Sequence, residues 1–135
     1  MIVINAENLI LGRLATYAAK QSLLGQEVRI INAEKAIVSG AKKTTYNEVR
    51  QNMDRGTPAK GPFIPKKADR YVRRVIRGML PYKQPKGAEA FKRVLCYVGI
   101  PPEFKEAKTA DLPFAKVDKL PTLNYVQIKD ILSHA

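Results

Sequence analysis

Residues 2–31 have the sequence IVINAENLILGRLATYAAKQSLLGQEVRII, in which two short apolar runs flank a longer amphipathic stretch. The runs Ile2–Ile4 and Val28–Ile31 are typical of strands that are buried on both faces. Between them, apolar residues recur at helical spacing over Gly12–Leu24, and Gly25 follows as a stop signal for the helix. A strand, a helix of about a dozen residues and a second strand together predict a right-handed parallel crossover unit.

The rest of the chain predicts further strands and helices. The pattern Thr45-x-x-Glu48 has the form of a capping box, so we expect a helix from about Thr45 to Met53. The other predicted elements are strands or extended stretches at Ala36–Val38, Val94–Val98 and Tyr125–Val126, and a last helical turn or two around Ile128–Leu132. The predicted fold class is therefore α/β with a mostly parallel sheet, in a single domain over residues 1–135.

The composition fits one folded domain and excludes several classes of protein. The chain has 135 residues, of which 45% are apolar, enough for one hydrophobic core. One cysteine, Cys96, and one histidine, His134, exclude an internal disulfide framework and a Cys/His zinc cluster. No apolar run approaches the roughly 18–20 residues that cross a bilayer, and the start MIVINAE has no features of a secretory signal.

The charge distribution singles out the middle of the chain. Lys and Arg number 24 against 12 Asp and Glu, so the net charge is +12. Residues 1–34 and 94–135 each contain equal numbers of basic and acidic side chains, whereas residues 35–93 contain the whole excess. Such a basic region attracts polyanions, so we expect a nucleic acid or an anionic membrane as its partner.

Residues 66–79, KKADRYVRRVIRGM, predict an amphipathic helix with one cationic face. Asp69 is the only acid in this stretch, so the basic side chains have few partners for i,i+4 ion pairs. A solvated helix face is the plain alternative, but charge of a single sign favours a partner that neutralises it. The apolar face, which we expect to pack on the sheet, consists of Ala68, Val72, Val75, Ile76 and Met79.

The loop that precedes this helix is also expected to bind the partner. Residues 53–65 contain three prolines and two glycines, which excludes regular structure. We expect the loop to be mobile in the isolated protein, because nothing in it can form a core. Its Phe63 is a candidate for stacking on RNA bases, with loop packing as the alternative. The candidate RNA-binding residues are Lys42, Lys43, Arg55, Lys60, Lys66, Lys67, Arg70, Arg73, Arg74, Arg77, Lys83 and Lys86.

A second candidate phosphate site is the turn at residues 39–45, SGAKKTT, between a predicted strand and a predicted helix. Backbone N–H groups at a helix start, together with two lysines, form a phosphate cradle, and a plain capped turn explains the pattern about as well. The turn lacks the first glycine and the spacing of a P-loop, which disfavours a phosphotransferase that uses ATP.

Two other partners are disfavoured. The apolar helix face consists of small and β-branched residues and the chain has no Trp, so it lacks the chemistry of a membrane-inserting helix. No helix-turn-helix pair, zinc finger or heptad dimeriser supports a DNA regulator, although charge alone does not exclude one.

Catalytic constellations are not convincing. His134 lies next to the end of the chain, and Cys96 lies inside an apolar run, where a small buried hydrophobe is the simplest explanation. We therefore expect no enzyme activity, no cofactor and no metal site. The acidic pairs of the Pro-rich tail, which we expect to be solvated, are Glu103 with Glu106 and Asp111 with Asp118.

Three stretches of the chain match a known family: NLILGRLAT at 8–16, INAEKAIVSG at 31–40, and RGMLP at 77–81 with Lys86-Gly87 after it. The sequence resembles the large-subunit ribosomal protein family thirteen (universal L-thirteen) over nearly its whole length, and RGMLP after a basic helix is the most specific match. Because the chain starts at its first strand and has no long helical extension at its end, it looks most like an archaeal member.

The resemblance implies a three-layer α/β/α domain around a mostly parallel four-stranded sheet. It also implies a structural constituent of the large ribosomal subunit in the cytoplasm, which binds ribosomal RNA and supports assembly and translation. The implied partners are large-subunit ribosomal RNA and neighbouring ribosomal proteins, with no membrane and no homo-oligomer. RNA contacts are implied at the 39–45 turn, the 55–67 loop, the basic helix and the segment through Lys86. The resemblance also suggests Arg13, at the start of the first helix, as a position of a family motif, and a structural salt link is an equal alternative there.

Overall fold

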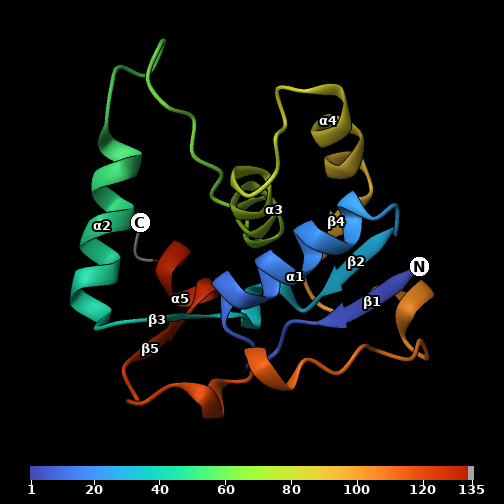
Figure 1. The fold of residues 1–135 in the computed structure, drawn as a ribbon. Coiled ribbons are helices and arrows are strands. Elements are labelled where there is room, and N and C mark those ends of the chain that lie inside the picture. The colour runs from blue at the N-terminus through green and yellow to red at the C-terminus, as the bar shows by residue number, and fades with distance from the viewer. Residues whose placement is uncertain (134–135) are drawn as a thin grey trace.

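The structure, a computed structural model, describes residues 1–133 and contains a parallel sheet, which lies on the right in Figure 1. The strands β1 (Ile2–Asn5), β2 (Val28–Ile31) and β4 (Val94–Cys96) pair in the order β1-β2-β4, all parallel. The helix α1 (Leu11–Leu23) connects β1 to β2, which confirms the predicted crossover unit. Gly25 follows α1 with a φ of +95°, a conformation that glycine adopts without strain, so the predicted stop is confirmed.

Helices cover one face of this sheet and form the main hydrophobic core. Ile4 and Ile30 of the sheet are fully buried against Leu14 of α1. The helices α3 (Ala68–Gly78) and α4 (Pro85–Lys92) pack on α1 in the same cluster. The α4 helix was not predicted from the sequence, although Pro85 stands at its start, where proline is favoured. At Gly87, a Cβ atom would overlap the backbone carbonyl of Pro81, so only glycine fits there.

The opposite face of the sheet is covered by a short turn. Val3 and Ile31 are buried there against Phe104, which lies at the end of a 3₁₀ turn over Pro102–Phe104. Tyr97 packs beside Phe104, with ring centroids 5.6 Å apart. The segment forms one tight turn, with Pro102 at its first position, where a three-layer fold would place a helix. The implied second helical layer is therefore replaced here by a 3₁₀ turn.

The implied four-stranded sheet is wrong: the described residues form a three-stranded parallel sheet and a separate antiparallel pair. The pair consists of β3 (Ile37–Ser39) and β5 (Tyr125–Gln127). The helices α2 (Lys42–Asp54) and α5 (Ile128–Ser133) pack on it, with Val49, Val126 and Ile131 buried in a small cluster of their own. His134 lies outside the described residues.

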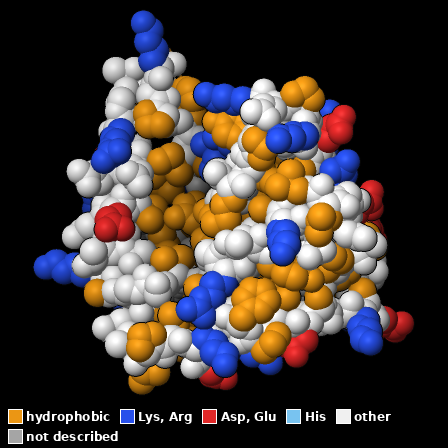
Figure 2. Space-filling model, in the orientation of Figure 1, with side chains coloured by type: hydrophobic (Ala, Val, Ile, Leu, Met, Phe, Trp, Pro, Cys, Tyr) orange, Lys and Arg blue, Asp and Glu red, His pale blue; other side chains and the backbone are white. Residues whose placement is uncertain are grey.

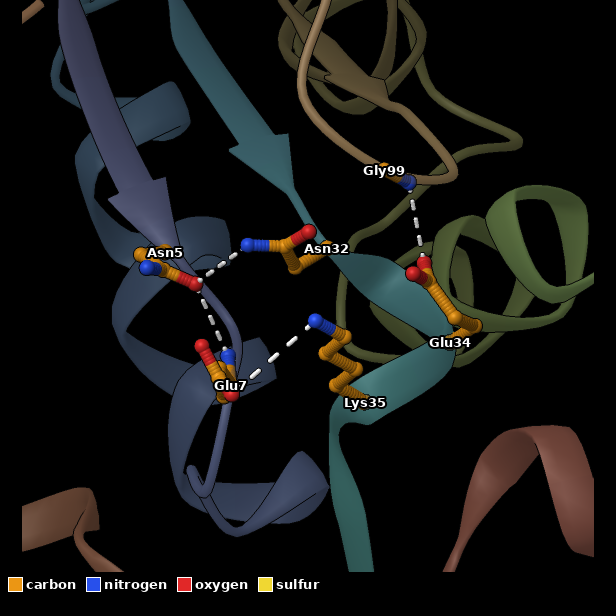
Figure 3. A network of polar contacts seen from close by, with 6 residues as sticks. All are labelled: Asn5, Glu7, Asn32, Glu34, Lys35 and Gly99. Carbon is orange, nitrogen blue, oxygen red and sulfur yellow. Dashed lines mark hydrogen bonds and ion pairs between the residues drawn. The ribbon is translucent and has the colours of Figure 1, made fainter. Parts of the chain in front are cut away.

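A polar network at the carboxyl ends of β1 and β2 explains why the chain leaves the parallel sheet (Figure 3). Asn32 is buried and has a φ of +56°, a left-handed conformation that Asn tolerates better than most residues. Its Nδ2 donates a hydrogen bond of 3.0 Å to Oδ1 of Asn5, which also accepts one from the Glu7 N–H. A 3₁₀ turn over Ala33–Lys35 follows, so the chain changes direction before β3 begins.

Two predicted helix starts need correction. The α2 helix begins at Lys42, and Thr45 is a buried residue within it, so the predicted capping box is wrong. The α3 helix begins at Ala68, so Lys66 precedes the helix and does not lie on its face.

Within residues 1–133, no helix is long and apolar enough to span a membrane, and no three metal-ligating side chains gather in one place.

Candidate nucleic-acid interface

The amphipathic helix α3 is the centre of the basic region. Its residues Ala68, Val72 and Ile76 are buried in the main core, which confirms the predicted apolar face at these three positions. Val75 is half-buried, and Met79 follows the helix and is 43% exposed, so its place on the predicted face is wrong. On its outer side, Arg70 and Arg74 are exposed to solvent. The helix therefore presents charge on one side because its other side supplies the core.

Arg73 lies on the cationic face but is half-buried and braces the fold. Its Nε donates a hydrogen bond of 2.8 Å to the Val94 carbonyl, and its Nη2 donates one of 3.1 Å to the Phe91 carbonyl. The guanidinium group lies 4.0 Å from the centroid of the Phe91 ring, which is a cation–π contact. Burial lowers the pKa of Arg73 from its ordinary value. Arg73 therefore connects α3 to the segment that joins α4 and β4.

Two further arginines of α3 contact the segments that follow and precede the helix in the chain: Arg77 contacts the segment after α3, and Arg74 contacts the loop before it. The guanidinium group of Arg77 lies 4.6 Å from the centroid of the Tyr82 ring. Its Nε is buried and has no hydrogen-bond partner within the described part of the chain. Arg74 donates a hydrogen bond of 3.2 Å from Nη2 to the Phe63 carbonyl, which holds the loop before α3 against the helix.

Four arginines of α3 surround a pocket of about 380 Å³, which we call the arginine pocket. None of its arginines forms an ion pair within the structure as described, where the paired arginines are Arg29, Arg50 and Arg93. Asp69 of the same helix has a buried Oδ1 atom without a hydrogen-bond partner in the described chain, and it forms no ion pair with them. Their positive charges are thus uncompensated within residues 1–133. The pocket is lined by Pro65, Arg70, Arg73, Arg74, Arg77 and Phe91.

The loop between α2 and α3 contains a closed turn. The Gly61 N–H donates a hydrogen bond of 2.6 Å to the Thr57 carbonyl, and the Lys60 N–H contacts the Thr57 hydroxyl oxygen at 3.2 Å. A Cβ atom on Gly61 would lie 2.8 Å from the Arg55 carbonyl oxygen, so glycine permits this close approach. Arg55 and Lys60 are exposed around the turn. The mobility that we expect for this loop in the free protein stays a prediction.

A second pocket of about 460 Å³ lies between this loop and the end of α2. Arg55 and Lys66 line it together with Phe63, which is 67% exposed. Phe63 is therefore not packed in the loop, and the structure leaves its ring accessible. Because Pro65 belongs to the arginine pocket and Phe63 to this one, the segment between them borders both pockets.

The other candidate residues lie apart from these pockets. Lys42 and Lys43 are exposed in the first turn of α2, about 20 Å of helix away from Arg55. Lys83 and Lys86 are exposed on the α3–α4 connection and in the first turn of α4. On the face seen in Figure 2, Lys and Arg side chains are likewise spread over the surface and do not form one patch. Lys67 is exposed immediately before α3.

Sequence reasoning missed Phe91 and left Arg13 open. Phe91 contributes a wall of the arginine pocket and the ring under Arg73, but no local pattern links residues this far apart in the chain.

Arg13 donates a hydrogen bond of 2.9 Å from Nη1 to the Phe114 carbonyl. The observed contact of Arg13 is therefore a hydrogen bond to a backbone carbonyl. A salt link to an acidic side chain is one of the alternatives that the sequence leaves open for this residue.

Comparison with known proteins identifies the family. The sequence model described as "Ribosomal protein L13" matches residues 1–103. The chain belongs to the ribosomal protein L13 family. It is 45% identical to the large ribosomal subunit protein uL13 of Methanosarcina barkeri over 132 residues, which cover 97% of this chain and 94% of the relative.

Two further relatives carry the same name. The uL13 protein of Methanopyrus kandleri is 46% identical over 131 residues, with 96% of this chain and 82% of the relative covered. That of Methanocaldococcus jannaschii is 44% identical over 138 residues, with 99% and 96% covered. These archaeal relatives confirm the resemblance to an archaeal-type member. The L13 family is structural and not enzymatic, which confirms the expectation that the chain is not an enzyme.

Proposed function

We propose that this chain is a structural constituent of the large ribosomal subunit, in the cytoplasm, and that it binds large-subunit ribosomal RNA. The names of its relatives support the ribosomal assignment. The observation that carries RNA binding is the set of arginines on α3, whose charges have no acidic partner within residues 1–133. Mutual repulsion of these groups costs free energy in the free protein, and a phosphate backbone relieves it.

The basic helix and the preceding loop form the proposed RNA-binding surface. Arginine suits this role because its planar group donates two parallel hydrogen bonds to one phosphate. By fixing RNA segments that otherwise repel one another, the protein supports assembly of the subunit and thereby translation. Neighbouring ribosomal proteins are its further partners. The proposed contact residues are Lys42, Lys43, Arg55, Lys60, Lys66, Lys67, Arg70, Arg73, Arg74, Arg77, Lys83 and Lys86.

The proposal treats residues 1–135 as one ribosomal-protein domain. The charge-balanced ends of the chain supply the parallel sheet and most of the core, and the basic middle supplies the surface. The RNA-binding part and the core are interleaved, since α3 contributes to both. A basic fragment cut out of the chain would therefore lose the support that positions its arginines.

A triple charge reversal tests the proposal. Lys66, Arg70 and Arg74 are exposed, so changing all three to Glu removes cations without removing core contacts. We expect affinity for large-subunit ribosomal RNA to fall by roughly 100-fold or more at moderate salt, because phosphate contacts are lost and repulsion is added. Filter binding measures the affinity, and circular dichroism checks that the fold is retained.

The matched control reverses the charge of three exposed lysines in residues 94–135, the charge-balanced tail of the chain. This changes the net charge by the same amount as the first variant. We expect this variant, in which Lys105, Lys108 and Lys119 become Glu, to lose much less affinity. Equal losses in the two variants would show that net charge, and not the surface around α3, determines binding. Unchanged binding of the first variant would contradict the proposed surface.

A further inference from the structure

We propose that the arginine pocket and Phe63 together bind one unpaired RNA nucleotide, with its phosphate in the pocket and its base stacked on the Phe63 ring. This inference rests on the proposed RNA binding and specifies the kind of RNA that the surface selects. It distinguishes a nucleotide that has left its helix from a regular duplex, whose bases are stacked inside.

The arginine pocket offers hydrogen-bond donors that the fold does not use. Arg70 is exposed and makes no hydrogen bond, ion pair or ring contact with the rest of the described chain, so its whole guanidinium group is available. Arg74 uses only Nη2, on the Phe63 carbonyl. Arg73 uses Nε and Nη2 and keeps Nη1. A phosphate in the pocket would thus find several donors around it, of which those of Arg73 and Arg74 belong to side chains that the fold already holds in place.

The size of the pocket suits a single phosphate with its ribose. At about 380 Å³, the arginine pocket lies at the lower end of the range of roughly 300–1,000 Å³ that is typical of ligand sites. It is a recess between α3, Pro65 and Phe91, whereas a duplex presents its phosphates along a broad ridge. The apolar walls, Pro65 and Phe91, match a sugar better than they match water.

Phe63 supplies the second half of the site. Its ring is 67% exposed, while its carbonyl accepts a hydrogen bond from Arg74 and the neighbouring Pro62 restricts the backbone before it. A large exposed aromatic ring is a suitable platform for a base, and the contact with Arg74 reduces the ordering that stacking requires. Figure 2 shows the molecule hollowed between the α2 side and the body, with hydrophobic side chains along the hollow.

The charges around Phe63 favour a nucleotide over an apolar protein segment. Arg55 and Lys66 line the same pocket as Phe63. Asp54 is the acid of this pocket, and it lies 3.9 Å from Arg50, which offsets its charge. An apolar protein partner would have to bury these cations without compensation, whereas RNA supplies phosphates for them.

The backbone segments that carry the two halves of the site are neighbours in the chain. Phe63 and Pro65 are two residues apart, so their Cα atoms are separated by at most about 7 Å. The base and the phosphate of a single nucleotide are separated on the same scale. Specific recognition of RNA commonly uses such unpaired, splayed nucleotides.

Two RNA hairpins test this inference with the full-length protein. One carries a single bulged iodouridine, and the other is identical but fully paired. We expect the bulged hairpin to bind about tenfold more tightly, because base stacking on an aromatic side chain contributes on that scale. Replacing Phe63 by Ala should abolish the difference, and Phe63→Tyr should keep it. Irradiation should crosslink the iodouridine to Phe63, which mass spectrometry of the digested protein detects.

Control variants separate this inference from the proposed function. Leu123→Ala removes a different apolar side chain, which is 90% exposed. We expect this variant to keep the preference for the bulged hairpin. Arg70→Gln should weaken binding of both hairpins. Equal affinity of the wild-type protein for the two hairpins would overturn the nucleotide site and leave general RNA binding intact. Failure to bind either hairpin, or large-subunit ribosomal RNA, at low salt would overturn both proposals.

Discussion

Two groups of arginines in this protein have opposite surroundings. At the amino ends of β2 and β4, Arg29 donates hydrogen bonds to the carbonyls of Val28 and Arg93 and lies 3.6 Å from Glu27. Arg93 donates to the Ser22 carbonyl and lies 4.0 Å from Glu89. Each of these arginines therefore has both a carbonyl and a carboxylate as partners. In the arginine pocket, by contrast, no carboxylate is paired with any of the arginines within the described residues.

The difference shows that residue type alone does not decide what an arginine does. Arginine stabilises the fold where strand ends and neighbouring acids offer acceptors, and it remains available for a ligand where the fold offers none. Arg73 combines the two situations, because it lies in the pocket while donating two hydrogen bonds to backbone carbonyls. Variants that affect one situation more than the other can test this contrast.

The largest expected effect concerns Cys96, which is buried in β4 near Arg73 of the arginine pocket. Burial raises the pKa of its thiol from 9.0 to about 12, and nearby Arg73 offsets this only in part. The folded state therefore keeps a proton that the unfolded chain releases, so stability is full below about pH 9 and falls as the pH rises toward 12. The expected loss is of the order of 4 kcal/mol.

Chemical denaturation of the wild-type protein and of Cys96→Ala at a series of alkaline pH values measures this loss. We expect the free energy of unfolding of the variant to fall less steeply with pH, because the variant has no thiol to titrate. Parallel curves for the two proteins would mean that Cys96 is not the group responsible. The burial of this cysteine would then contribute little to the pH dependence of stability.

The next effect compares two adjacent arginines. Arg73→Gln removes hydrogen bonds to the Val94 and Phe91 carbonyls, so we expect a loss of about 1–3 kcal/mol in unfolding free energy. Arg74→Gln removes one exposed hydrogen bond and should cost about 0.5 kcal/mol or less. Thermal and urea unfolding measure both. Similar losses in the two variants would mean that Arg73 does not brace α3 against the rest of the fold.

The smallest effect concerns the salt dependence of RNA binding. Removing one phosphate contact should reduce the slope of log affinity against log salt by about 1. We expect Arg70→Gln to show this reduction, because Arg70 is exposed and lines the arginine pocket. Lys119→Gln, in the charge-balanced tail, should leave the slope unchanged. Equal slopes for all three proteins would remove Arg70 from the set of phosphate contacts.

Much of the fold was predictable because its signals are local. The spacing of apolar residues predicted α1 and the buried face of α3, and short apolar runs predicted β1, β2 and β4. The separation of β3 from the parallel sheet was not predictable. It depends on the left-handed turn at Asn32 and on its hydrogen bond to Asn5, a residue distant in sequence. The helix α4 was missed because it is short and its glycine disfavours helix in isolation.

The site was predictable in its charge but not in its geometry. The sequence identified α3 and its basic residues, and the structure brings four of its arginines around one pocket. The partial burial of Arg73 and Arg77 was not predicted, because a helical wheel gives a direction around the helix but not what packs there. Their contacts with Phe91 and Tyr82 come from the following segment, which the helical pattern does not include.

The sequence by itself determined the α/β class, the amphipathic basic helix and the family, because periodicity, charge and family motifs are properties of the chain read in order. Only the tertiary structure decided which arginines are bound to the protein itself and which remain free. That outcome depends on where backbone carbonyls and carboxylates from distant segments come to lie. Arg73 finds its acceptor at Val94, 21 residues away, and no local pattern encodes that meeting.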